Sequence, residues 1–355
     1  MIFHSGILAL LIGSVLVTVM TLYAGLLGTV VLLRWDFQSS SAYQLSLERK
    51  TYLISTIMNY VLGFQILSVF LFVYTAEDIH QLFVGAMCAT GSLNANPVGW
   101  LALLSKIIIC FAAGLWLVLN YLDHLGEDFP LVRLKYAVLL VLLPCICADL
   151  YLQLQYFLGL DPDIITSCCG SLFSTSGGSV ASSIAGLPAG PSMVVFYTGF
   201  VLYAVTSLFG LFWEKAFLRY LHSSLAALFF IISMASVVSF ISMYVYELPT
   251  HHCPFDMIQK EYSFIGYPLY ATLFCGVFFG LLPGIFQRAG SIPSLQRNFR
   301  KIERTWLLFS LGCMTSFVML TTYMVLFSNL TYFSVLKVLA GNTANERIIP
   351  CLLQH

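Results

Sequence analysis

Eight stretches of the chain are apolar over about 20 residues or more, which is the length a helix needs to cross a bilayer. They cover residues 6–33, 51–75, 98–121, 136–159, 191–213, 223–246, 263–286 and 306–328. Only helices and closed barrels satisfy all their backbone polar groups in lipid, and barrel strands are much shorter and alternate in polarity. The sequence therefore predicts an all-α, polytopic integral membrane protein with about eight transmembrane helices.

The scarcity of charge supports the same class. Charged residues make up 9% of the chain and hydrophobic residues 59%, whereas a soluble domain carries about 25% charged residues. The lipid bilayer is therefore the expected solvent. No long polar linker interrupts the pattern, so we treat residues 1–355 as a single transmembrane helical domain. The net charge is zero and there is no basic tail, so no nucleic acid is expected as a partner.

The orientation follows from the lysine and arginine residues, which gather in the loops on the cytoplasmic side. The first basic residue, Arg34, follows the first apolar stretch, so this stretch is expected to remain as a membrane helix rather than to be cleaved. One set of connecting segments holds twelve basic residues and the opposite set three. We predict a multi-pass protein of the bacterial inner membrane with both termini in the periplasm (N-out, C-out).

Three long segments are then expected on the outer side, at residues 76–97, 160–190 and 247–262. The first two mix small residues with apolar ones, which favours re-entrant loops that dip back among the helices; a packed outer cap is the alternative. The longest inner segment, 287–305, is basic and is expected to lie on anionic headgroups. A docking surface for a cytoplasmic partner is the other interpretation.

Cysteines and histidines concentrate on the predicted outer side. In an oxidising compartment such thiols form disulfides, bind metal or carry out redox chemistry. Five of the ten cysteines and three of the seven histidines belong to this group: Cys88, Cys168, Cys169, Cys253, Cys351, His80, His251 and His252.

The first interpretation is structural, with disulfide bonds that staple the outer cap. Four of the five cysteines can pair, for example with Cys351 left over, and the sequence does not fix the connectivity.

The second interpretation is thiol–disulfide exchange. Cys168 and Cys169 are adjacent, and a bridge between neighbouring residues is strained and easily reduced.

A short motif also favours exchange. The sequence Cys-Pro-Phe-Asp at residues 253–256 resembles the Cys-Pro-x-Cys motif of membrane disulfide oxidoreductases, over these four residues. Asp256 stands where the second cysteine belongs, so Cys253 needs a partner thiol from elsewhere, such as Cys88 or Cys169. His252, next to Cys253, is placed to favour its thiolate form.

The third interpretation is a metal site. Thiolate and imidazole ligands suit a zinc or copper ion. The candidate ligands are His251, His252, Cys253 and His80, with Cys88 or the adjacent cysteine pair completing the set.

Two ionisable residues lie within the predicted spans and form an intramembrane polar pair. Lys106 lies about nine residues below the outer end of its span and Asp149 about eleven, which places both roughly 13–17 Å deep. Charged groups at such depth are costly and normally pair. We predict a buried ion pair, with a structural role or a role in a proton or ion pathway.

The function predicted from these patterns is an inner-membrane subunit of a larger protein complex. Its periplasmic thiol or metal site, centred on Cys253, Cys168, Cys169 and Cys88, would act in redox chemistry or soft-metal handling. A permease or transport component that uses Lys106 and Asp149 is one alternative, and a structural subunit with a disulfide-stapled cap is the other. Whether the protein is an enzyme is left open.

Overall fold

The computed structural model describes residues 3–36, 41–126, 128–161 and 180–330. These residues contain no strand, and eight of their helices are long and apolar enough to cross a membrane. The protein is therefore an all-α, multi-pass membrane protein, as the hydropathy pattern predicts. The spanning segments are Ser5–Arg34, Ala42–Leu82, Gly99–Leu125, Val132–Leu158, Ala189–Phe212, Ala216–Tyr246, Gly266–Ile285 and Asn298–Phe327.

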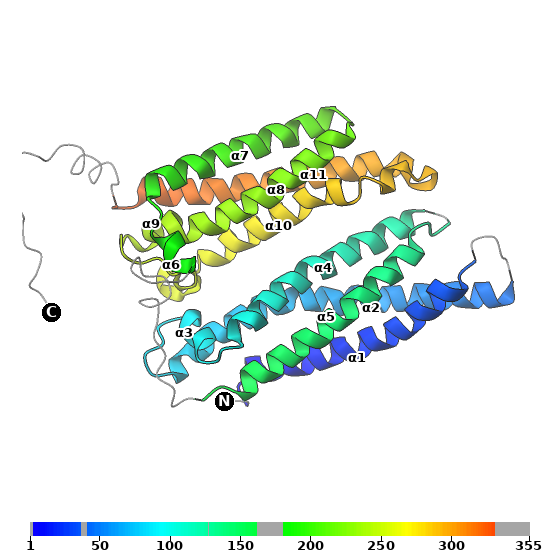
Figure 1. The fold of residues 1–355 in the computed structure, drawn as a ribbon, viewed down its shortest axis with the longest axis horizontal. Helices are drawn as coiled ribbons and strands as arrows, with labels where there is room; N and C mark the ends of the chain where they lie inside the picture. Colours follow the sequence, from blue (N-terminus) through cyan, green and yellow to red (C-terminus); the bar gives the residue numbers. More distant parts are fainter. Residues whose placement is uncertain (1–2, 37–40, 127, 162–179, 331–355) are drawn as a thin grey trace, which may run out of the picture.

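The first four long helices form one bundle, called the N-bundle here. Each contacts two neighbours in a closed ring, α1 and α4 both packing on α2 and on α5. The short helices η1 and α3 lie in the connection between α2 and α4 (Figure 1). The bounds are α1 Ser5–Arg34, α2 Ala42–Asp78, η1 Ile79–Leu82, α3 Ala89–Asn94, α4 Gly99–Leu125 and α5 Val132–Leu158.

The last four long helices repeat this plan in a C-bundle. Helices α8 and α11 both pack on α7 and on α10. Again the long connection falls between the second and third long helices. The bounds are α6 Val180–Ala185, α7 Ala189–Phe212, α8 Ala216–Ser236, the π-helix η2 Val237–Ile241, α9 Ser242–Tyr246, η3 Asp256–Ile258, η4 Lys260–Tyr262, α10 Gly266–Ile285, η5 Ala289–Ser291 and α11 Pro293–Phe327.

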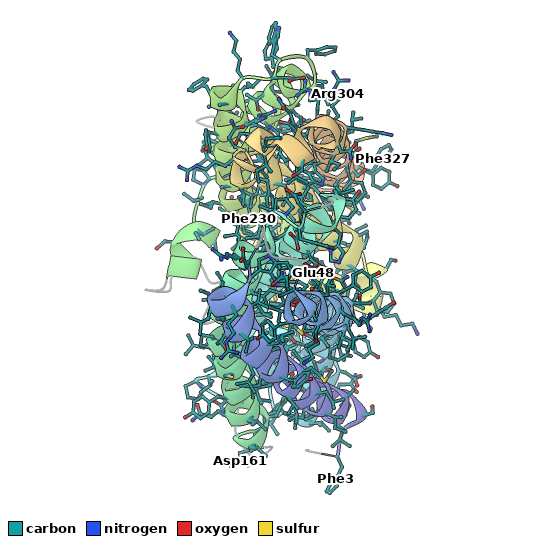
Figure 2. All side chains as sticks on the ribbon, turned by 90° about the vertical axis from the view of Figure 1, so that its right-hand side faces the viewer. Phe3, Glu48, Asp161, Phe230, Arg304 and Phe327 are labelled. Atoms are coloured by element: carbon teal, nitrogen blue, oxygen red, sulfur yellow. The ribbon has the colours of Figure 1, made fainter. Side chains whose placement is uncertain are left out.

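The two bundles lie side by side with their helices roughly parallel, and Figure 2 shows them one above the other when viewed along the helices. Helices α3, α6 and α9 all lie at the end where α1 begins (Figure 1). We call this the outer end, following the orientation predicted from the charges. The segment 76–97 forms η1 and a buried α3 there, packed over α2 and α4.

Three sets of contacts join the bundles. Near the middle, Phe111 of α4 lies 5.8–6.1 Å, ring centroid to ring centroid, from Phe230 of α8 and from Phe274 and Phe278 of α10. The inner ends share an apolar cluster that includes Leu119 of α4 and residues of α10 and α11. The outer connections of the two bundles meet at the third set, which forms the site described below.

The basic inner segment 287–305 contains η5 and the first turns of α11, which runs without a break from Pro293 to Phe327. Leu295 and Phe299, in its first two turns, are buried against the inner end of the N-bundle. Arg300 pairs with Glu214 and Glu303. The basic residues of this segment therefore flank a helix that packs into the protein.

Candidate thiol–carboxylate site

Two predicted thiols meet where the outer connections of the bundles touch. Cys88 precedes α3 in the N-bundle, and Cys253 lies between α9 and η3 in the C-bundle. Their sulfur atoms are 3.5 Å apart, and both side chains are 0% exposed. A disulfide bond is about 2.05 Å long, so this is a non-bonded contact at a distance from which a small movement forms the bond. The site thus takes one thiol from each half of the chain.

A carboxylate completes the cluster. Asp256 begins η3 and is buried. Its oxygen and the sulfur atoms of Cys88 and Cys253 all lie within 4.8 Å of one another; no other group of three or more histidine, cysteine or acidic residues in the described part of the chain is gathered this closely. The hydroxyl of Thr90 lies 3.4 Å from the Cys253 sulfur. Two thiols and a carboxylate can exchange protons or bind a soft divalent metal ion.

Asp256 connects the thiols to the surface through His251. The distance from His251 Nε2 to Asp256 Oδ2 is 2.5 Å, and the His251 side chain is 30% exposed against 9% for Asp256. Burial raises the pKa of Asp256. The hydrogen bonds from His251, Cys88 and Cys253 lower the pKa by more than burial raises it, so the pKa lies below its ordinary value. At neutral pH the site therefore holds an anionic carboxylate in contact with a half-buried imidazole.

Tyrosine hydroxyls hold the backbone around Cys253. Tyr246 donates a hydrogen bond to the Cys253 carbonyl, and Tyr270 of α10 donates one to the Pro254 carbonyl, both at 2.6 Å. The ring of Tyr246 also packs edge-on against His251, with centroids 4.7 Å apart. Each bond satisfies a carbonyl that the irregular backbone leaves without a helical partner. The two tyrosines thereby fix the position of the Cys253 thiol.

The N-bundle holds Cys88 through Glu77, at the end of α2. One carboxylate oxygen of Glu77 accepts the backbone N–H of Ala89, at 2.7 Å. The other accepts a hydrogen bond at 2.6 Å from Gln259 of the C-bundle, whose amide also donates to the Met87 carbonyl at 2.8 Å. Sequence analysis missed Glu77 as a functional candidate, although an acidic residue at the end of a membrane span is an available signal.

The predicted histidines take different places. His252 Nδ1 lies 2.9 Å from the Val238 carbonyl in the π-helix η2, where the altered register leaves backbone groups open to side chains. His80 Nδ1 contacts the Glu77 backbone carbonyl and lies 3.3 Å from the Glu77 carboxylate. His251 reaches the site through Asp256. The ligand atoms gathered around Cys253 are thus those of Cys88 and Asp256, while the predicted ligands His80, His251 and His252 stand outside that group. Cys168 and Cys169 lie outside the described residues.

The predicted ion pair within the membrane is present in the N-bundle. Lys106 Nζ lies 2.7 Å from Asp149 Oδ2, and the two side chains are 0% and 2% exposed. Asp149 also accepts hydrogen bonds from Gln65 at 3.0 Å and from Ser105 at 2.7 Å. Ser14 Oγ lies 3.4 Å from the ammonium group. The charges are therefore satisfied within one bundle.

A second buried pair lies near the inner end and was not predicted. Lys135 Nζ is 2.6 Å from Asp123 Oδ2 and 3.0 Å from Asn120 Oδ1. The sequence places Lys135 in an inner loop, but α5 already begins at Val132, so this lysine faces the core. The two pairs share α4, whose buried side chains between Lys106 and Asn120 are apolar: Ile109, Ala113, Trp116 and Leu119. This separation favours a structural role for each pair.

Fold and site together define an α-helical membrane protein of two four-helix bundles with a buried thiol–carboxylate cluster at their outer junction. Comparison of the chain with protein-family models, curated proteins and solved structures finds no match. The functional argument therefore depends on the chemistry of the site.

Proposed function

We propose that this chain is a subunit of a bacterial inner-membrane complex that exchanges electrons with thiols on the periplasmic side, using Cys88 and Cys253 as its redox pair. The observation that carries the proposal is the 3.5 Å contact between two buried thiols that come from different bundles. Both termini are then periplasmic.

The neighbouring groups suit proton transfer. Oxidation of the pair breaks two S–H bonds, forms one S–S bond and releases two protons and two electrons. Asp256 accepts hydrogen bonds from both thiols. It is also hydrogen-bonded to His251, whose side chain is partly exposed at the surface. We assign Asp256 and His251 the role of carrying the thiol protons outwards.

The substrate side of the reaction is disulfide exchange. An oxidised Cys88–Cys253 pair takes two electrons and two protons from a substrate dithiol, which leaves as a disulfide. Because Cys88 and Cys253 are buried, a shuttle thiol is needed to reach them. The adjacent cysteines 168 and 169, on the next outer segment of the sequence, are the thiols of this chain suited to that role.

The test is a redox titration of the purified protein in detergent. The protein is equilibrated in thiol–disulfide buffers of stepped potential, alkylated and mapped by mass spectrometry. We expect a Cys88–Cys253 bridge that forms and breaks reversibly and is absent from Cys88→Ser and Cys253→Ser. Cys275→Ser, which changes an exposed cysteine of α10, is the matched control and should titrate like the wild type. A pair that stays fully reduced or fully bridged across the whole range contradicts the proposal.

A metal centre is the second candidate function, because Cys88, Cys253 and Asp256 offer three ligand atoms within 4.8 Å of one another. Two sulfurs that share one tetrahedral zinc ion lie about 3.8 Å apart at a Zn–S distance of about 2.3 Å, close to the 3.5 Å found here. Elemental mass spectrometry of the purified protein separates the two candidates. One zinc or copper ion per chain, lost in Asp256→Asn and in Cys253→Ser, would favour the metal centre.

A further inference from the structure

The chain around the two thiols of the outer junction is exposed to different degrees. Cys88 directly follows an exposed stretch, in which Met87 is 71% exposed. Cys253 lies between His252 and Pro254, which are both buried. A small local movement of the outer surface therefore uncovers Cys88 more readily than Cys253.

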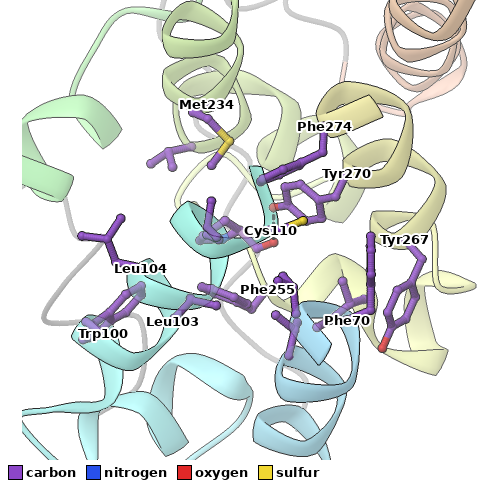
Figure 3. A pocket seen from close by; sticks show the side chains of 16 residues that line it. Phe70, Trp100, Leu103, Leu104, Cys110, Met234, Phe255, Tyr267, Tyr270 and Phe274 are labelled. Atoms are coloured by element: carbon purple, nitrogen blue, oxygen red, sulfur yellow. Dashed lines mark hydrogen bonds between the residues drawn. The ribbon is translucent and has the colours of Figure 1, made fainter. Parts of the chain in front are cut away.

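The chain that follows Cys253 borders the membrane interior. Pro254 and Phe255 line an apolar cavity of about 350 Å³ between the bundles, and Figure 3 shows Phe255 there among aromatic side chains such as Trp100 and Tyr270. The other walls belong to the membrane-spanning helices α2, α4, α8 and α10, and none of the lining residues that the structure describes is charged. A water-soluble thiol is therefore not expected to approach Cys253 from this side.

The hydroxyl of Thr90 contacts Cys253 because of the place of Thr90 in α3. A threonine inside a helix commonly donates to a carbonyl three or four residues earlier, as Thr18 and Thr21 do at 2.8 and 2.7 Å. Thr90 is the second residue of α3, so no carbonyl of this helix lies four residues before it. Its hydroxyl instead lies 3.4 Å from the Cys253 sulfur, and both residues are 0% exposed. The contact is therefore shielded from water.

Thr90 is the donor in this contact. The ionised Asp256 carboxylate offers acceptors only, and it accepts hydrogen bonds from both thiols. The S–H proton of Cys253 is thereby directed to Asp256, so the hydrogen between Thr90 and Cys253 comes from the Thr90 hydroxyl. Hydrogen bonds to a charged group favour its charged form, and a buried charge without such a bond is costly. Thr90 therefore stabilises the Cys253 thiolate that forms when a bridge to Cys88 is opened.

We propose that an incoming thiol opens the Cys88–Cys253 bridge at Cys88, and that Thr90 is a catalytic residue that stabilises Cys253 as the leaving thiolate. The inference rests on the proposed function, which needs a bridge that substrate thiols can open. The incoming thiolate forms an S–S bond to Cys88, the Cys88–Cys253 bond breaks, and its electron pair stays on the Cys253 sulfur. The proton of the incoming thiol passes to Cys253 through His251 and Asp256. A second thiol then displaces Cys88, so that the substrate leaves as a disulfide and both cysteines are reduced.

The first test maps the intermediate on the wild type, so that the result does not depend on the folding of a variant. The oxidised protein in detergent is mixed with reduced glutathione, quenched with acid, alkylated and digested for mass spectrometry. We expect glutathione on Cys88 and the alkyl group on Cys253. Glutathione on Cys253, or equally on both cysteines, overturns the inference, while the proposed function stands.

The second test measures the rate at which glutathione opens the bridge. Thr90→Val keeps the shape of the side chain and removes the hydroxyl, so the rate should fall about tenfold or more, whereas Thr90→Ser keeps the hydroxyl and should react at close to the wild-type rate. Thr21→Val is the matched control and should react like the wild type, because Thr21 is equally buried and its hydroxyl bonds a helix carbonyl. A Thr90→Val rate equal to that of the wild type overturns the inference. A chain in which no Cys88–Cys253 bridge forms removes both the inference and the proposed function.

Discussion

Replacing Lys106 by methionine and Asp149 by leucine tests the packing of the N-bundle, because the two changes leave different charges behind. Breaking a buried ion pair costs about 3–5 kcal/mol. In Lys106→Met, the Asp149 carboxylate keeps hydrogen bonds from Gln65 and Ser105, and bonds of this kind to a charged group each contribute about 1.5–3 kcal/mol. We therefore expect Lys106→Met to lower the free energy of unfolding by about 3 kcal/mol, near the lower end of this range.

Asp149→Leu should lower the free energy of unfolding by more, about 5 kcal/mol. The reason is that the Lys106 ammonium then keeps one contact, with the Ser14 hydroxyl at 3.4 Å. The double variant removes both charges and should be more stable than Asp149→Leu alone. The assay is equilibrium unfolding in mixed micelles, followed by circular dichroism and analysed as a double-mutant cycle. Lys260→Met, an exposed lysine near the outer end, is the control and should change stability by less than about 0.5 kcal/mol.

Two results would refute this reasoning. If the double variant lowers the free energy of unfolding by the sum of the two single changes, Lys106 and Asp149 do not interact. A Lys106→Met protein as stable as the Lys260→Met control means that Lys106 is not buried against a charge.

Two further predictions concern the outer junction. A Cβ atom on Gly99, the first residue of α4, would lie 2.3 Å from the Leu93 carbonyl oxygen, so Gly99→Ala should lower the unfolding free energy by about 1–3 kcal/mol. Gly63→Ala, where a Cβ meets nothing within 4 Å, should have little effect in the same unfolding assay. The pKa of Asp256 lies below its ordinary value, so the ionised carboxylate stabilises the fold above its unfolded pKa of about 3.9, and this contribution disappears as the pH falls through the lower folded pKa. Melting temperatures measured on acidification should therefore fall more steeply for the wild type than for Asp256→Asn; parallel curves would contradict this.

The helices themselves could be predicted from the sequence because lipid imposes a simple rule on each segment independently. A span is recognised by its own length and apolarity, whatever its neighbours are. The Lys106–Asp149 contact could be predicted for a related reason, since depth along a helix follows from counting residues. Cys88 was also a named partner for Cys253, because the motif at 253–256 requires a second thiol from another segment.

What escaped prediction depends on contacts between segments. Lys135 lies at the edge of an apolar stretch, and only the packing of α5 against α4 shows that it faces Asp123 rather than water. Asp256 was noted as a missing cysteine, whereas in the structure it is the third member of the cluster. Glu77 acquires its role from Ala89 and Gln259, and the latter is 182 positions away in the chain.

The division into two like bundles has a consequence for how the protein enters the membrane. Each half crosses four times, so each starts and finishes on the same side, and the orientation of one half does not depend on that of the other. The Lys106–Asp149 and Lys135–Asp123 pairs are both closed within the N-bundle, so these four charges are neutralised without any residue of the second half. The outer junction of Cys88 with Cys253 can form only when both halves are in place, which makes the thiol site a reporter of completed assembly.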